Sequence, residues 1–164
     1  MRPTLTMMSA IAAALVLGAA TPVSAMGGSD SKTTSAPAKT VDPDYARAKA
    51  MIEARDYKSA IPLLQQVVAK DARNADAFNL LGFATRKSGD PNGSLQYYNQ
   101  ALSIDPKHVG AMEYLGEAYL QLNRLPEAEQ QLGKLDAACV FGCLEQRTLK
   151  SAIADYKAGK KPTN

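Results

Sequence analysis

The chain contains one histidine, two cysteines and no tryptophan among its 164 residues. His108 falls in a predicted loop with no second ligand at metal-binding spacing, so we expect it to be a surface side chain. The sequence also has no phosphate loop, no paired-carboxylate motif and no nucleophile with an adjacent base. These absences predict a chain without a catalytic site, a metal site or a cofactor.

An excess of charge of one sign is missing as well. The 19 basic residues face 16 acidic ones, which gives a net charge of +3. Nucleic-acid binding requires a concentrated basic patch. The only basic cluster lies in a terminal tail that contains glycine and proline, at Lys157, Lys160 and Lys161. We interpret this tail as a solvated terminus and expect no nucleic-acid partner.

Long apolar runs are absent apart from one near the start. Arg2 precedes an apolar run over 7–20, and small residues follow it, including Val23 and Ala25. The run of about 14 residues is shorter than the roughly 20 that a membrane-spanning helix needs. The pattern predicts a signal peptide over 1–25 that is cleaved after Ala25. We therefore expect a periplasmic or secreted protein with no membrane attachment after cleavage.

The segment that follows, 26–40, lacks aromatic residues and has almost no branched apolar ones. Such a composition cannot bury enough surface to offset the entropy of ordering the chain. It predicts a disordered linker. The remainder, 41–164, is long and apolar enough for one modest domain.

The most informative pattern is a period of 34 residues, which relates blocks 75–108 and 109–142. A weaker third copy occupies 41–74. Apolar and small residues recur at equivalent places, pairing Leu81 with Leu115, Gly82 with Gly116, Ser94 with Ala128, Tyr98 with Leu132 and Ala101 with Leu135. A period of this length predicts a solenoid of helix hairpins. A solenoid offers a surface that holds a partner rather than a pocket for reaction.

Turn residues divide each block into two helices. Gly89 and Asn123 both tolerate the left-handed backbone that ends helices. Asp90 is a helix cap and Pro91 suits a first helical position. The periodicity predicts helices over 75–88, 91–103, 109–122 and 126–137.

The repeated residues resemble the tetratricopeptide repeat. Two sets match its pattern of large and small residues, namely Phe78, Leu81, Gly82, Ser94, Tyr98, Ala101 and Pro106, and then Met112, Leu115, Gly116, Tyr119 and Ala128. Thr85, Val140 and Asp44 depart from it. The resemblance covers 41–138 and implies an all-α fold, a right-handed superhelical α-solenoid of three hairpins with repeats 41–74, 75–108 and 109–138.

The resemblance also implies a concave groove, lined by the first helix of each repeat, in which a partner peptide would lie. The expected groove residues are Tyr45, Lys49, Asn79, Phe83, Arg86, Lys87, Glu113 and Glu117. An exposed Phe83 beside Asn79, Arg86 and Lys87 is the best candidate contact, although an ordinary solvated helix face explains the same residues. The paired Lys and Asn that grip a terminal carboxylate in chaperone-binding relatives are not reproduced.

The two cysteines, Cys139 and Cys143, are four residues apart with Gly142 between them. In an oxidising compartment this spacing predicts a local disulfide, because the glycine permits a bend. The last segment, 139–164, is then a cysteine-containing corner, a capping helix over 144–157 and the basic tail. It resembles small exported bacterial members of the family.

The expected function is that of a non-catalytic adaptor or assembly factor that binds a short segment of a partner protein. Two other functions stay open at this point. The solenoid could self-associate as a homodimer without a separate client, or Cys139 and Cys143 could serve an exported thiol-disulfide factor.

Overall fold

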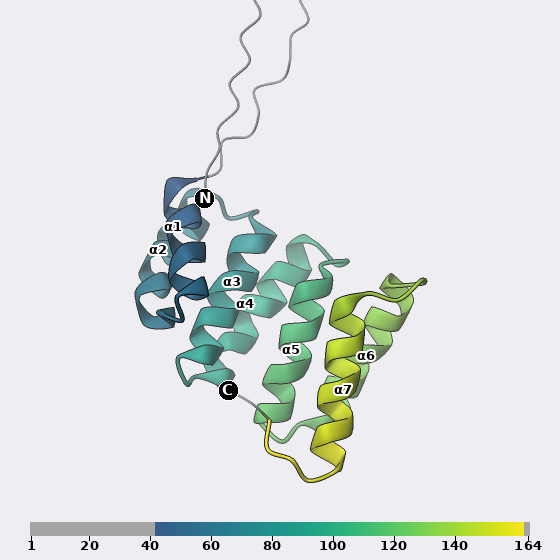
Figure 1. Ribbon diagram of the computed structural model, residues 1–164. Helices are drawn as coiled ribbons and strands as arrows, with labels where there is room; N and C mark the ends of the chain where they lie inside the picture. Colours follow the sequence, from purple (N-terminus) through teal and green to yellow (C-terminus); the bar gives the residue numbers. More distant parts are fainter. Residues whose placement is uncertain (1–41, 163–164) are drawn as a thin grey trace, which may run out of the picture. The chain divides into compact units, whose positions relative to one another are not determined.

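A computed structural model describes residues 42–162, which form helices and no strand (Figure 1). The predicted signal peptide and linker lie outside the described residues. The helices in chain order are α1 (Pro43–Glu53), α2 (Tyr57–Lys70), α3 (Ala75–Lys87), α4 (Pro91–Ile104), α5 (Val109–Gln121), α6 (Leu125–Ala138) and α7 (Leu144–Lys157).

The first six helices form three antiparallel hairpins, α1–α2, α3–α4 and α5–α6, and each hairpin packs against the next. Within this stack the first helices α1, α3 and α5 lie side by side, with α7 next to α5 (Figure 1). The expected all-α solenoid with a C-terminal capping helix is therefore confirmed.

The turns inside the hairpins use the left-handed backbone conformation at equivalent positions. Gly89 has a φ of 104° and Asn123 a φ of 58°, as their residue types predict. Arg55, which stands 34 residues before Gly89 in the sequence, takes the same conformation with a φ of 62°. A non-glycine residue adopts it at a cost, so the first repeat carries a strained turn that the sequence did not reveal.

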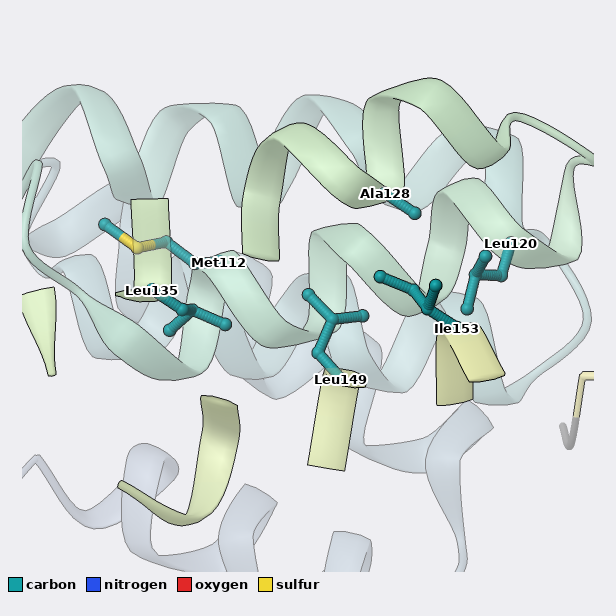
Figure 2. Packing of buried hydrophobic residues seen from close by; sticks show 6 residues of the cluster. All are labelled: Met112, Leu120, Ala128, Leu135, Leu149 and Ile153. Carbon is teal, nitrogen blue, oxygen red and sulfur yellow. The ribbon is translucent and has the colours of Figure 1, made fainter. Parts of the chain in front are cut away.

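Helix α7 completes the apolar core of the third repeat. Leu149 and Ile153 are buried against Met112 and Leu120 of α5 and against α6 residues that include Leu135 (Figure 2). Leu144 of the same helix lies outside this core. Leu144 is 67% exposed, because it stands at the first position of α7, beyond the end of the core.

The corner before α7 brings the two cysteines together. The structure pairs Cys139 with Cys143 as a disulfide, with Cα atoms 5.6 Å apart, and Gly142 has a φ of 79°. The backbone bends at Gly142, as we expected from the position of this glycine between the two cysteines. Formation of the bond in the cell stays a prediction.

Candidate functional site

The candidate site is the face built by α1, α3 and α5, called here the first-helix face. The structure places all eight predicted groove residues on these helices but exposes them unequally. Lys49 is exposed, Tyr45, Phe83, Lys87 and Glu117 are half-buried, and Asn79, Arg86 and Glu113 are buried. The prediction of a freely exposed cluster around Phe83 is therefore wrong, because neighbouring repeats cover much of it.

Arg86 is fully buried and already has partners. Its Nη2 donates to Glu117 Oε2 at 2.6 Å, and its Nε donates a long hydrogen bond of 3.4 Å to the Tyr98 hydroxyl. A buried guanidinium needs such partners to offset the loss of water. Since Glu117 lies on the first helix of the next repeat, Arg86 ties the second repeat to the third. Its Nη1 has no hydrogen-bond partner among the described residues.

An aromatic cluster surrounds this ion pair. The ring of Phe83 contacts Tyr57 with centroids 5.9 Å apart and Tyr114 with centroids 4.8 Å apart. Arg86 lies 5.6 Å from the Phe83 centroid and 5.8 Å from that of Tyr114, distances typical of cation–π contacts. The cluster gives the first-helix face a half-buried aromatic centre.

Lys87 extends from the same cluster toward solvent. Its Nζ lies 5.7 Å from the Phe83 ring centroid. Burial lowers the pKa of Lys87, and the positive charge of Arg86 adds to this effect.

A hollow of about 450 Å³ opens where α3, α5 and α7 begin, and we call it the acidic hollow. Its lining consists of Asp76, Asn79, Asp105, Lys107, His108, Val109, Gly110, Glu113, Tyr114 and Glu145. Burial raises the pKa of Glu113 to about 7, and the nearby carboxylates of Glu117 and Glu145 act in the same direction. The hollow is thus lined by four carboxyl groups, and that of Glu113 keeps its proton to a higher pH than an exposed glutamate would.

A second hollow of about 530 Å³ lies between α5 and α7 and reaches the C-terminal tail. Glu117 and Leu120 of α5 form one side, and Ala152 and Tyr156 of α7 form another. The tail contributes Lys160 and Lys161. Helix α7 thus lines both hollows, in addition to the capping role that its sequence predicts.

His108 is not the surface side chain that the sequence suggested. Its imidazole is 13% exposed and caps α5, because Nδ1 accepts a hydrogen bond from the backbone N–H of Ala111 at 3.1 Å. Its Nε2 lies 3.1 Å from a carboxylate oxygen of Asp76 in the preceding repeat. This geometry fits a neutral ring that accepts at one nitrogen and donates at the other.

Between residues 42 and 162, no group of three or more His, Cys, Asp or Glu side chains is arranged to hold a metal ion. None of the helices in that range is long and apolar enough to cross a membrane.

Sequence reasoning missed Tyr114, Glu145 and Tyr57. Tyr114 could have been found, because it stands three residues before Glu117 and thus on the same side of α5. Glu145 and Tyr57 reach the site from α7 and α2, whose placement no spacing within the first helices predicts.

Comparison with known protein families gives two matches that together run from residue 45 to 138. Residues 45–107 match one tetratricopeptide repeat model, and residues 86–138 match another. The matched ranges span all three hairpins.

Similar proteins include Protein FlbA of Caulobacter vibrioides, which is 34% identical over 82 residues. The match covers 50% of this chain but only 14% of FlbA.

Among solved structures, the Yersinia enterocolitica type III secretion chaperone SycD, in complex with a peptide of the translocator YopD, is similar. The match has a TM-score of 0.61 and 20% identity, and it covers 71% of this chain and 88% of SycD. The second tetratricopeptide domain of human RPAP3, in complex with an HSP70 peptide, matches with a TM-score of 0.62 and 22% identity. It covers 68% of this chain and 92% of that domain. At these identities the likeness establishes the fold.

Proposed function

Because the chain belongs to the tetratricopeptide repeat family, we propose that it is a non-catalytic module that binds a short segment of a partner protein on its first-helix face. The single observation that carries the proposal is the position of its hollows. Both described hollows are lined by residues of α5, and one of them reaches α3 as well. The solved structures of SycD and RPAP3 each contain a bound peptide, which supports the same use here.

The length of the array limits what it can hold. The array has three hairpins, which is about the minimum for a stable solenoid, and α7 packs against the last of them. The binding face is therefore short. We therefore propose an adaptor or assembly factor that recognises one brief segment rather than a long stretch of a partner.

We propose that the protein works in the periplasm or outside the cell. The signal-like pattern over 1–25 and the pairing of Cys139 with Cys143 support this location. N-terminal sequencing of the chain from an envelope fraction should begin at Met26. A chain that still begins at Met1 in the cytoplasmic fraction would remove the proposal of export.

Site-specific photocrosslinking in cells tests the binding face. A photoreactive residue at Lys49 or Lys87 should capture a partner that the same residue at Asn99, exposed on the second helix α4, does not. Equal capture from both faces would contradict the proposal. Capture of a second copy of this chain from Lys49 or Lys87, with a dimer in light scattering, would instead support self-association.

A further inference from the structure

Of the large apolar side chains between residues 42 and 162, three are exposed, and all three lie at the corner that joins α6 to α7 (Figure 1). We call Val140, Phe141 and Leu144 the apolar tip. We propose that the apolar tip and the basic residues of α7 dock the protein on an anionic phospholipid membrane. This surface lies outside the first-helix face, and its use revises our expectation from the sequence that the mature chain has no membrane attachment.

The apolar tip is held in an ordered turn. The backbone N–H of Gly142 donates to the carbonyl oxygen of Cys139 at 2.7 Å, and the disulfide closes the same loop. The Gln146 side chain donates to Asp136 at 2.6 Å, which joins the start of α7 to the end of α6. Phe141 is nevertheless fully exposed. A side chain presented by an ordered turn loses little conformational entropy when it is bound.

The residue types of the apolar tip are unusual for a turn that faces solvent. Such turns are rich in glycine, asparagine, aspartate and serine. The three apolar side chains also lie outside the core that α7 completes. Exposed apolar clusters of this kind mark contact with another surface.

The segment that carries the apolar tip is also basic. Residues 139–162 have five basic side chains and two acidic ones, a net charge of +3, whereas residues 42–138 have 11 basic and 13 acidic ones, a net charge of −2. Arg147 and Lys150 are exposed, and neither has an ion-pair partner among the described residues. An anionic membrane surface attracts such side chains.

The apolar tip and these two cations lie next to each other along the outer side of α7. Leu149 and Ile153 face the core, and Arg147, two residues before Leu149, lies on the opposite side of the helix. Leu144 precedes Arg147 by three residues and Lys150 follows it by three, so the three side chains are neighbours. One surface therefore combines apolar and positively charged groups.

A lipid surface fits this combination better than a second copy of the chain. Two copies would bring the same positive charge together. A stable protein interface buries about 800 Å² per partner, whereas a phenylalanine side chain buries at most about 250 Å². A bilayer takes up a projecting apolar side chain without a pre-formed pocket. Apolar insertion and basic residues together give stable surface binding, where one alone is weak.

Vesicle flotation tests the proposal. The chain from Met26 is suitable, because it keeps the compact unit Lys39–Asn164 whole and leaves out the apolar run at 7–20. It should bind vesicles of phosphatidylcholine with about one third phosphatidylglycerol at least about ten-fold more tightly than pure phosphatidylcholine, and less tightly as salt is raised. Equal binding to both vesicles, or no binding, would overturn the proposal.

Variants at exposed positions separate docking from general attraction. Arg147→Gln with Lys150→Gln should weaken vesicle binding by at least about ten-fold. Arg73→Gln with Lys58→Gln removes the same charge from the first repeat and should weaken it by about two-fold or less. Phe141→Ser should weaken it by about ten-fold at unchanged net charge. Equal losses in the two double variants, or full binding by Phe141→Ser, would contradict the proposal.

A tryptophan reporter shows whether the apolar tip enters the membrane. The chain has no tryptophan, so Phe141→Trp gives a single fluorescence signal. Its emission should shift to the blue on the anionic vesicles and be quenched by lipids brominated in their acyl chains. Asn99→Trp, at an exposed position of α4, is the control and should show neither change. Flotation of Phe141→Trp without a blue shift would overturn insertion of the tip.

Crosslinking in cells from a photoreactive residue at Phe141 distinguishes the partners. Crosslinks to lipid would support the proposal. Crosslinks to a protein in place of lipid would overturn it, and so would a dimer in light scattering that Phe141→Ser converts to a monomer. Capture of a partner from Lys49 or Lys87 is a separate result, so the proposed function and membrane docking can fail independently.

Discussion

The second and third repeats place different chemistry at the same repeat positions. Arg86 in the second repeat is equivalent to Leu120 in the third, and both are buried. Gly82 lies against Tyr98 of its own hairpin, whereas its equivalent Gly116 lies against Leu149 of α7. The second repeat meets another repeat through an ion pair, while the third meets α7 through apolar side chains. The residues that pack at equivalent positions therefore differ because α3 is followed by another repeat, whereas α5 is followed by α7.

The largest expected loss of stability comes from replacing Arg86 of the second repeat by leucine, the residue at the equivalent position of the third. Arg86→Leu removes the cation that pairs with Glu117 and should lower the free energy of unfolding by about 3 kcal/mol. Urea denaturation measures this. Arg86→Leu combined with Glu117→Gln should recover part of the loss, because no carboxylate is then left without its partner. Strictly additive losses would show that the two residues do not interact.

A second prediction concerns the carboxyl group that α7 helps to bury. Because the pKa of Glu113 is raised from 4.5 to about 7, the folded state holds its proton more tightly than the unfolded state. The resulting stability is present below about pH 4.5 and is lost as the pH rises through about 7. Glu113→Gln should therefore stabilise the protein above pH 7, by up to about 3 kcal/mol.

Denaturation curves of this variant and the parent at about pH 5 and pH 8 test that sign. Glu53→Gln, at an exposed position of α1, is the matched control and should change little at either pH. Loss of stability at pH 8 in Glu113→Gln would mean that the ionised carboxylate is needed by the fold.

Substitutions of the two equivalent glycines test two different contacts, the packing within the second hairpin and the packing of α7 on α5. A Cβ at Gly82 would lie 2.7 Å from the buried Tyr98 ring, and one at Gly116 would lie 2.5 Å from Leu149. Gly82→Ala and Gly116→Ala should each cost about 1–3 kcal/mol through overpacking. Only Gly116→Ala should speed amide hydrogen exchange in α7 while leaving α1 to α4 protected.

Gly133→Ala is the control for both glycine variants. A Cβ at this exposed position of α6 would meet no atom within 4 Å. It should stabilise the helix by about 1 kcal/mol or less, because alanine is the better helix former. Faster exchange of α7 in both Gly82→Ala and Gly116→Ala would erase the distinction between the repeats.

The smallest effect is expected at the corner that leads into α7. Joint replacement of Cys139 and Cys143 by serine should lower stability by at most about 2 kcal/mol, because the closed loop is short. Thermal unfolding under oxidising conditions measures this. Cellular function should survive the change. Its loss in a variant that is still folded would favour the thiol-disulfide role.

The sequence predicted the features of the fold that depend on turn residues and on the 34-residue period. Gly89, Asp90 and Pro91 mark the turn of the second hairpin, and the 34-residue spacing places Leu81 and Leu115 in the core. It also predicted α7 as a helix with the observed bounds.

The burial of the site residues was not predictable in this way. Arg86 is buried because Glu117, 31 residues away, and the Tyr98 hydroxyl converge on it in the folded stack. Glu113 is buried where α7 brings Glu145 toward it. The exposure of side chains on the first-helix face thus depends on packing between helices. The spacing of residues within one helix does not predict that packing.

The most direct test of the central claim is to map the binding of a captured partner segment by nuclear magnetic resonance. The account predicts that backbone signals of α1, α3 and α5 shift, while those of exposed residues on α2, α4 and α6 do not. Shifts confined to the second helices would contradict it.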